Sequence, residues 1–455
     1  MPRTLAAMLF ALVLFPLATR AQQPNMPDMP GMDMGSKPMN MKMKKMSMMS
    51  GMHQPTTLIE AELNHTSSGT SAEPASTPTP MLMSHHGPWM LMLHGTAFIS
   101  DTQQSGPRGA DKLFSTNWLM PMAMRHLGPG QLTLRAMFSL EPATVSGRQY
   151  PELFQQGETA FGKPIIDGQH PHNFFMEVAA LYDIRLGQQT LLSFYAAPIG
   201  DPAIGPTAYP HRLSASEDPL AALGHHQEDS THIAYNVLTG GITWRGLRFE
   251  ESGFHGGEPS EQRWGFQPSP NGHAIDSYSS RITFSPTPNW SGQYSIAHIV
   301  SPEALYPNED QQRQTASIMY NKPLGGTTHT GNWSSTLLWG RTRSLSDNSK
   351  ENSYLVESLL QFRTRNYLWT RIENAGRSNE LLISPGSHLP PNFEESPIGH
   401  VQAYSIGYDL DFHILPHLLA APGAQFTTYT APEALVPTYG HHPVGVVAFV
   451  RFRLH

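Results

Sequence analysis

Methionine is concentrated in one short segment near the start of the chain. Residues 26–53 contain eleven of the 23 methionines, no aromatic residue, and a histidine at the end. Thioether sulfur is a soft, neutral ligand that favours Cu(I) or Ag(I) over Zn²⁺, Ca²⁺ or Mg²⁺. Because the chain has no cysteine, soft-metal chemistry must use methionine sulfur and histidine nitrogen. The candidate ligands in this segment are Met26, Met29, Met32, Met34, Met39, Met41, Met43, Met46, Met48, Met49, Met52 and His53.

The segment opens with the spacing M-x-x-M-x-x-M-x-M, and a chain of this kind can wrap two or three thioethers around one ion. Residues 26–53 resemble the methionine-rich leader of the copper-resistance protein B family, whose members are also predicted outer-membrane barrels. The resemblance covers about these residues alone. It implies Cu(I) as the bound ion and a periplasmic copper-handling protein as partner. A low-complexity linker that scavenges oxidants is the alternative interpretation.

Histidines form a second candidate set, in two segments that read as long loops. His170 and His172 form an H-x-H pair, and the stretch from 211 to 232 adds more histidines and carboxylates. Imidazole and carboxylate together suit Cu(II), Zn²⁺ or Ni²⁺. Alternatively, the histidines hydrogen-bond the loop backbone and shape a constriction. The candidate metal ligands are His170, His172, His211, His225, His226, Asp229 and His232.

A third set consists of charged residues on strand-like segments, where we expect them to line a pore and to select the solutes that pass. They are Arg248, Glu250, Arg341, Arg363, Arg371 and Glu373. The chain contains no Gly-x-Ser-x-Gly, P-loop or dinucleotide fingerprint, so nothing indicates an enzyme. The only basic cluster is the short one at 42–45, and we expect no nucleic-acid partner.

The elements that carry these residues read as strands. Charged residues make up only 14% of the chain, whereas there are 38 glycines and 40 prolines, which favours strands joined by turns over helices. Alternation with a period of two predicts sixteen strands. They lie at 88–99, 113–125, 131–140, 174–185, 189–198, 231–244, 247–254, 276–284, 290–300, 313–322, 332–341, 353–363, 366–374, 400–412, 416–426 and 444–454.

The connections between these segments alternate between short turns and long loops. That pattern is typical of an outer-membrane β-barrel, with short periplasmic turns and long external loops. The last segment agrees, since Val446, Val450 and Phe452 alternate with residues that turn basic at Arg451 and Arg453. We therefore expect an all-β, antiparallel transmembrane barrel of 14 to 16 strands, whose lumen is open to water unless loops fold inward. Beyond the methionine-rich leader, the chain resembles outer-membrane barrels only in general.

Three regions follow from these patterns. Residues 1–21 read as a signal peptide, 22–84 as a disordered arm rich in Met, Ser, Thr and Pro, and 85–455 as the barrel. We expect the barrel in the outer membrane of a Gram-negative-type cell, in contact with lipid, with the arm in the periplasm. The predicted function is binding, sequestration or passage of copper. Two alternatives stay open, namely a general porin with no metal role and a secreted soluble all-β binding protein.

Overall fold

The structure is a computed structural model that describes residues 54–229, 233–268, 272–326 and 330–455. The predicted signal peptide and the methionine-rich segment 26–53 lie outside these residues, as does His232. Among the described residues, no helix is both long enough and apolar enough to cross a membrane.

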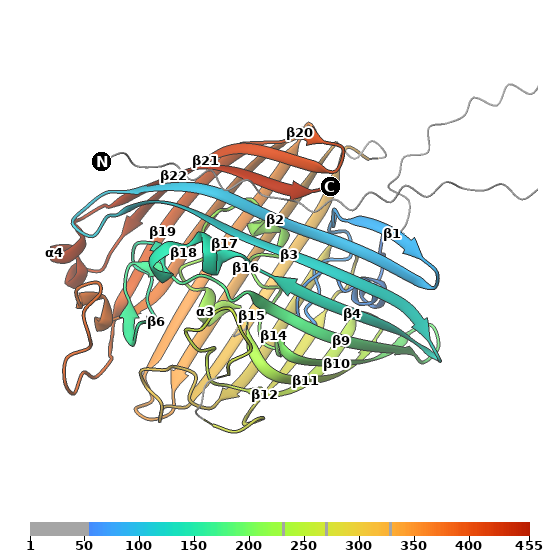
Figure 1. The fold of residues 1–455 in the computed structure, drawn as a ribbon, viewed down its shortest axis with the longest axis horizontal. Helices are drawn as coiled ribbons and strands as arrows, with labels where there is room; N and C mark the ends of the chain where they lie inside the picture. The colour runs from blue at the N-terminus through green and yellow to red at the C-terminus, as the bar shows by residue number, and fades with distance from the viewer. Residues whose placement is uncertain (1–53, 230–232, 269–271, 327–329) are drawn as a thin grey trace, which may run out of the picture. The chain divides into compact units, whose positions relative to one another are not determined.

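The described residues form a closed antiparallel barrel of sixteen strands (Figure 1). Each wall strand pairs with its neighbours in the chain, and the last strand returns to the first, with Ile99 opposite Val450. The wall strands are β2 (Trp89–Gln104), β3 (Asp111–Leu127), β4 (Gly130–Phe138), β9 (Phe175–Arg185), β10 (Thr190–Gly200), β11 (Ala234–Trp244), β12 (Leu247–His255), β13 (Ser277–Phe284), β14 (Trp290–Ile299), β15 (Gln311–Leu324), β16 (Gly331–Ser344), β17 (Lys350–Phe362), β18 (Asn366–Ser378), β19 (Pro397–Leu410), β21 (Leu418–Thr430) and β22 (Val444–Leu454).

Every predicted strand is present, and most bounds agree within a few residues. Two loops expected to be long are shorter, because β2 and β3 extend to leave only 105–110 between them, and β16 and β17 leave only 345–349. The remaining elements are α1 (Leu58–Asn64), β1 (Leu82–His86), α2 (Glu141–Thr144), η1 (Ser146–Arg148), β5 (Tyr150–Pro151), β6 (Glu158–Ala160), β7 (Lys163–Ile165), β8 (Gly168–Gln169), η2 (Leu213–Ala215), α3 (His225–Glu228), η4 (Asn379–Leu382), β20 (Phe412–Leu415), η5 (Glu433–Leu435) and α4 (Val436–Tyr439).

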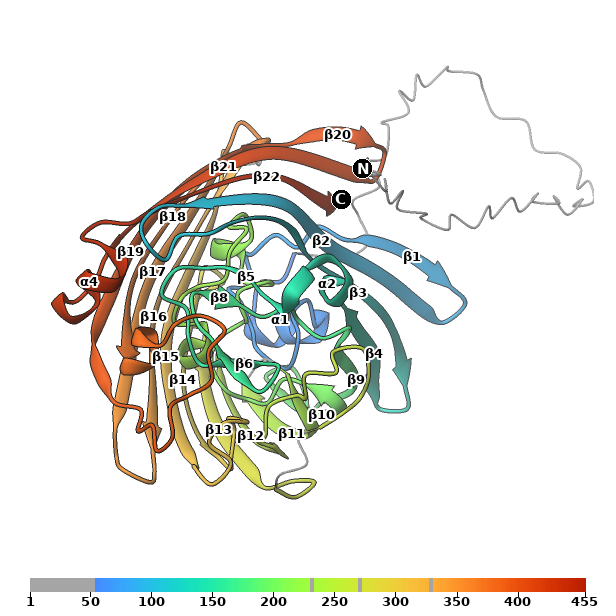
Figure 2. The same cartoon turned by 60° about the vertical axis from the view of Figure 1, so that its left-hand side comes forward.

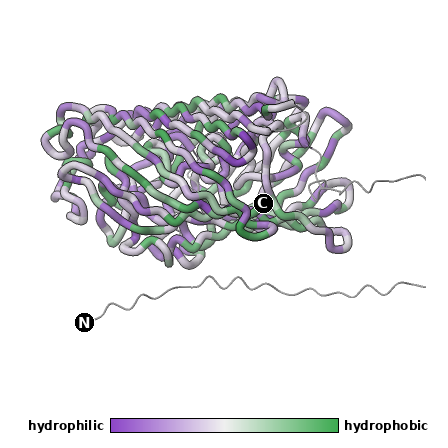
Figure 3. The backbone as a smooth tube through the Cα atoms, turned by 90° about the horizontal axis from the view of Figure 1, so that it is seen from above, coloured by the Kyte–Doolittle hydropathy of each residue, from purple (hydrophilic) through white to green (hydrophobic). Residues whose placement is uncertain are grey.

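Side chains alternate between the two faces of the wall, and Figure 3 shows hydrophobic and hydrophilic residues alternating along it. The outward face is apolar: Phe194, Leu238 and Ile318 are all about half exposed. On β22 the alternation runs as predicted, with Val446 outward and Arg451 fully buried inside. A closed sheet with an apolar exterior and a polar interior is the architecture of an outer-membrane barrel, and it does not fit a soluble sandwich.

Tryptophans mark the ends of the outward face. Trp244 and Trp290 stand at strand ends and are 54% and 41% exposed. Arg245 lies over the Trp244 ring, with its guanidinium carbon 4.8 Å from the ring centroid. Amphipathic rings at strand ends suit the boundary between lipid and water. Trp369 is an exception, because it is 2% exposed and packs inside the barrel.

Residues 54–80 are ordered and occupy the lumen. The disordered arm predicted over 22–84 therefore includes residues that belong to the folded structure. We call residues 54–80 the plug. Figure 2 shows its helix α1 inside the ring of strands. Thr57 caps the helix, and Leu58 and Ile59 are 2% and 4% exposed. The composition reads as disordered because the segment has few apolar residues. Its backbone instead forms hydrogen bonds with polar side chains of the wall, and the sequence pattern does not reveal those partners.

Candidate functional site

An ion pair on the inner wall holds the middle of the plug. Arg135 on β4 and Glu177 on β9 are both fully buried, with N–O distances of 2.6 and 2.8 Å. The Gly69 N–H donates to Glu177 at 2.9 Å, and Arg135 donates to the Gly69 carbonyl at 2.5 Å. Arg135 also donates to the His65 carbonyl at 3.0 Å. Both polar groups of Gly69 are therefore bonded to the wall by charge-assisted hydrogen bonds, which are stronger than neutral ones.

Only glycine suits position 69. Its φ of +60° lies in the left-handed region. A Cβ atom there would lie 2.7 Å from the Cβ of Asp201 and 3.2 Å from its carbonyl oxygen. Substitution at this residue must push the plug away from the wall, since the neighbouring atoms include backbone.

A second anchor lies on β12 and β13. Arg248 donates to the Thr70 carbonyl at 3.0 Å, and Arg281 donates to the Thr70 hydroxyl at 2.8 Å. Glu250 lies between the two arginines, at 3.1 and 2.9 Å. Arg248 also lies 3.5 Å from Glu62 of α1. The wall charges are therefore neutralised in pairs and bonded to the plug.

The end of the plug is held at the edge where the short turns lie. Asn321 on β15 donates to the Ser76 carbonyl at 2.7 Å and to its hydroxyl at 3.0 Å. Ser291 on β14 donates to the Ala72 carbonyl at 2.9 Å. Together with the two charged anchors, these bonds attach the plug to several strands around the barrel.

The long loops also fold inward. In the loop that follows β10, fully buried Arg212 bridges Asp229 at 2.7 Å and Glu357 of β17 at 2.5 Å. Glu373 of β18 accepts from the Leu223 N–H at 2.5 Å. The plug contacts this loop as well, since Glu73 accepts from the Leu213 N–H at 2.9 Å. The lumen is therefore filled from both ends.

The residues predicted to line the pore fall into two groups. Arg248, Glu250, Arg371 and Glu373 are buried on the inner face, where they bind the plug or the inward loops. The prediction is wrong for Arg341, which lies on the outward face beside Trp339, 5.1 Å from its ring centroid. It is also wrong for Arg363, which lies in the turn between β17 and β18.

Three carboxyl groups at the plug have raised pKa values. Burial raises the pKa of Glu62 to about 7 despite nearby Arg248, and raises that of Glu73 to about 7 despite the bond from Leu213. Burial, and then the charge of Glu177, raise the pKa of Asp201 to about 7. Each group therefore holds its proton more tightly while the plug is in place.

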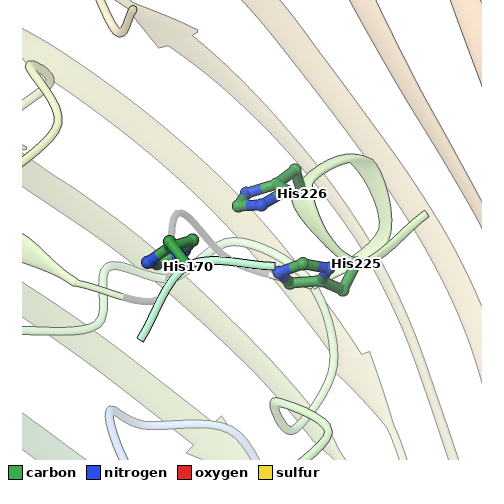
Figure 4. A group of neighbouring side chains, drawn as sticks. All are labelled: His170, His225 and His226. Carbon is green, nitrogen blue, oxygen red and sulfur yellow. The ribbon is translucent and has the colours of Figure 1, made fainter. Parts of the chain in front are cut away.

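Three histidines from the two longest loops meet inside one small group (Figure 4). His170 follows β8, and His225 and His226 begin α3. Each offers a ring nitrogen, and these nitrogens all lie within 4.8 Å of one another. His170 Nδ1 lies 2.9 Å from the Pro171 carbonyl, and His225 Nδ1 lies 2.8 Å from the Ala222 carbonyl. His225 Nε2 lies 3.3 Å from the amide nitrogen of Gln169. When Nδ1 donates to a carbonyl, Nε2 is the nitrogen that a metal ion would bind.

Glu158 on β6 completes this cluster. One of its oxygens, Oε1, lies 3.0 Å from Nε2 of His170 and 3.0 Å from Nε2 of His226. Burial alone would raise the pKa of Glu158, but the two imidazoles outweigh it and hold that pKa well below its usual range. Burial lowers the pKa of His170. Because both nitrogens of His170 face acceptor oxygens, at the Pro171 carbonyl and at Glu158, a proton or a metal ion must lie between Nε2 and the carboxylate.

The other predicted ligands lie apart from this cluster. His172 contacts Glu141 at 3.0 Å, and its ring centroid lies 6.2 Å from that of His170. Asp229 forms the ion pair with Arg212. His211 contacts the sulfur of Met137 at 3.2 Å. Sequence reasoning missed Glu158, because no spacing ties it to histidines of another loop.

A cavity of about 270 Å³ adjoins the cluster. Its lining includes Glu158, His170, His226, Glu258, Arg263 and Arg313. Charges of both signs therefore surround this cavity, which suits a small polar solute or a hydrated ion.

No protein-family model matches the chain, and no curated protein matches it. Among solved structures it is similar to an anion-selective porin from Comamonas acidovorans, at 10% identity, covering 80% of this chain and 99% of that one, with a TM-score of 0.45. It is also similar to Pseudomonas putida OprB, at 10% identity, 81% and 94% coverage, and a TM-score of 0.49. A third similar structure is Salmonella typhi OmpF in complex with daunomycin, at 8% identity, covering 81% of this chain and 100% of that one, with a TM-score of 0.47. Because these TM-scores are low, the assignment to the barrel class rests on the strand pairing.

We predict that Gly69→Ala opens the barrel. The added Cβ displaces the plug from the Arg135–Glu177 pair, and we expect the open probability in planar bilayers to rise by about tenfold or more, since overpacking costs about 1–3 kcal/mol. Gly87→Ala is the matched control, because Gly87 has a φ of +56° but no atom within 4 Å of the added Cβ. Equal conductance of the two variants would contradict this role of Gly69.

We also predict that the plug binds less tightly as the pH rises. Glu62, Glu73 and Asp201 bind protons more tightly with the plug in place than when exposed, where their pKa values are 4.5, 4.5 and 3.8. Their contribution to the free energy of plug binding is therefore complete below about pH 4 and is lost as the pH rises to about 7. Bilayer conductance should be higher at pH 8 than at pH 5.5, and Glu62→Gln should reduce the difference. Higher conductance at pH 5.5 would contradict the assignment.

Proposed function

We propose that this protein is an outer-membrane channel of the porin type that is closed in its resting state. The observation that carries the proposal is the closed barrel with an apolar exterior and a polar lumen filled by the plug and two loops. Sixteen-stranded barrels of this class enclose an aqueous channel when nothing fills them. Passage through this one requires the plug or a loop to move.

The plug is suited to such movement. It is attached mainly by hydrogen bonds and ion pairs, and water can replace these when the segment leaves. The cavity beside His226 lies among the long loops, where a solute would first meet the barrel. Small polar solutes are the class that fits this charged lining.

Metal binding is the second candidate function, and the specific observation that favours it is the set His170, His225, His226 and Glu158. Three imidazoles and a carboxylate suit Cu(II) or Zn²⁺. In this proposal the loops capture Cu(II), and residues 26–53 separately provide thioethers for Cu(I) in the periplasm, so no ion changes its oxidation state inside the barrel. A periplasmic copper-handling partner would then receive the ion. A porin with no metal role is the competing outcome.

We predict that the full-length protein binds Zn²⁺ at the histidine cluster. Zn²⁺ is the probe because thioethers do not favour it, so residues 26–53 contribute little. Loss of a residue that only hydrogen-bonds a metal ligand typically weakens metal binding by roughly 10- to 100-fold. His226→Ala removes a ligand itself, so it should weaken Zn²⁺ binding by more than this. Isothermal titration in detergent measures the affinity.

His388→Ala is the control, since this loop histidine is exposed and lies outside the cluster. Glu158→Gln should also weaken binding while it retains the size of the side chain. If the wild-type protein and both cluster variants fail to bind Zn²⁺, the metal role of the loops is excluded and the plain channel is the better account.

A further inference from the structure

The inner wall carries a second concentration of methionine, distinct from residues 26–53. Nine of the ten methionines in the described residues belong to one packed cluster. They are Met81, Met83, Met90, Met92, Met120, Met122, Met124, Met137 and Met176. Most lie on β2 and β3, where Met90 is opposite Met124 and Met92 is opposite Met122. Alternate residues of a strand share a face, so these side chains form a row along the lumen.

Two histidines join this row where it passes the plug. His94 continues the row on β2, opposite Met120 on β3. The His211 ring lies with its centroid 5.9 Å from that of His94, and its Nε2 is 3.2 Å from the sulfur of Met137. Trp118 packs against both imidazoles, with centroid distances of 5.1 and 4.4 Å. Two nitrogen and two thioether ligands therefore come from β2, β3, β4 and the loop after β10.

His94 is the observation that points to a ligand. Its side chain is 5% exposed, and its Nε2 has no hydrogen-bond partner among the residues that the structure describes. A buried polar atom without a partner is destabilising, so such an atom needs an explanation. An ion bound to this nitrogen would provide one.

The surroundings suit a cation with one charge. A cavity of about 20 Å³ beside Met137 and His211 is large enough for one ion, and Asp201 and Asp229 also line it. Arg135 lies nearby, but its charge is neutralised by Glu177 at 2.6 Å. The ligands themselves are neutral and soft, which excludes a preference for Ca²⁺ or Mg²⁺.

We propose that His94, Met120, Met137 and His211 form a binding site for Cu(I) or Ag(I) inside the barrel. The remaining methionines of the row would offer further thioethers along the wall toward the short-turn edge. The site needs no change in oxidation state, because the ion arrives and leaves as a single positive charge. It is independent of the histidine cluster of the loops, which uses different residues and a harder ligand set.

Titration of the full-length protein with Ag(I) against a competing chelator tests the proposal, since Ag(I) is a redox-inert probe for the site. Met137→Leu and Met120→Leu remove thioethers with little change in volume, and such substitutions are among the best tolerated in a packed core. Each variant should bind about one Ag(I) fewer than the wild type, or its affinity for Ag(I) should fall by about tenfold. His211 lies in the loop after β10, so His211→Gln removes a ligand of the same site without altering the wall.

Two controls separate this site from others. Met319→Leu removes the buried methionine of β15 that lies outside the cluster, and it should bind Ag(I) as the wild type does. His226→Ala should also leave Ag(I) binding unchanged. Absence of the loop site is therefore seen in the Zn²⁺ titration, and absence of the wall site is seen in the Ag(I) titration. Residues 26–53 add the same background to every variant. Wild-type binding by Met137→Leu, Met120→Leu and His211→Gln would overturn the proposal.

Discussion

Charges buried inside a barrel must be neutralised and hydrogen-bonded, and this constraint explains how the lumen is filled. Removing one partner from a buried ion pair typically costs about 3–5 kcal/mol. Arg135 and Glu177 satisfy each other only in part, and the peptide groups of Gly69, the His65 carbonyl and the Tyr195 hydroxyl use further donor and acceptor capacity. Arg248 and Arg281 use Thr70 in the same way. The plug is thus a binding partner of the wall, and its sequence needs few apolar residues.

This constraint links closure to function. A lumen filled by polar contacts can open, because water can take over each hydrogen bond as the plug leaves. A lumen filled by an apolar core would not open as easily. The histidine cluster lies on the loops and the methionine row lies on the wall, so the imidazoles of the cluster and the thioethers of the row occupy different places along one barrel. The two sites can therefore be separated by mutation.

Much of the fold could be predicted from the sequence, because a wall strand has a period of two that can be read from its residues. The strand ending in Arg451 and Arg453 shows this, with its apolar and basic faces. The sequence predicts only that His170, His225 and His226 lie in two long loops, and it does not predict Glu158 as their neighbour. Such contacts depend on loop conformations with no periodic signal. The methionine row was available in the sequence, since Met90 and Met92, and Met120, Met122 and Met124, are spaced by two residues.

Closure of the barrel by the plug is tested most directly by a disulfide tether between the two. The chain has no cysteine, so Ser76→Cys with Asn321→Cys adds the only thiols, at side chains that lie 3.0 Å apart. Bilayer conductance is recorded from one preparation, oxidised and then reduced. We predict that the oxidised protein is closed and that reduction produces channel openings. Equal conductance in the two states, with the disulfide shown to form and to be reduced, would contradict closure by the plug.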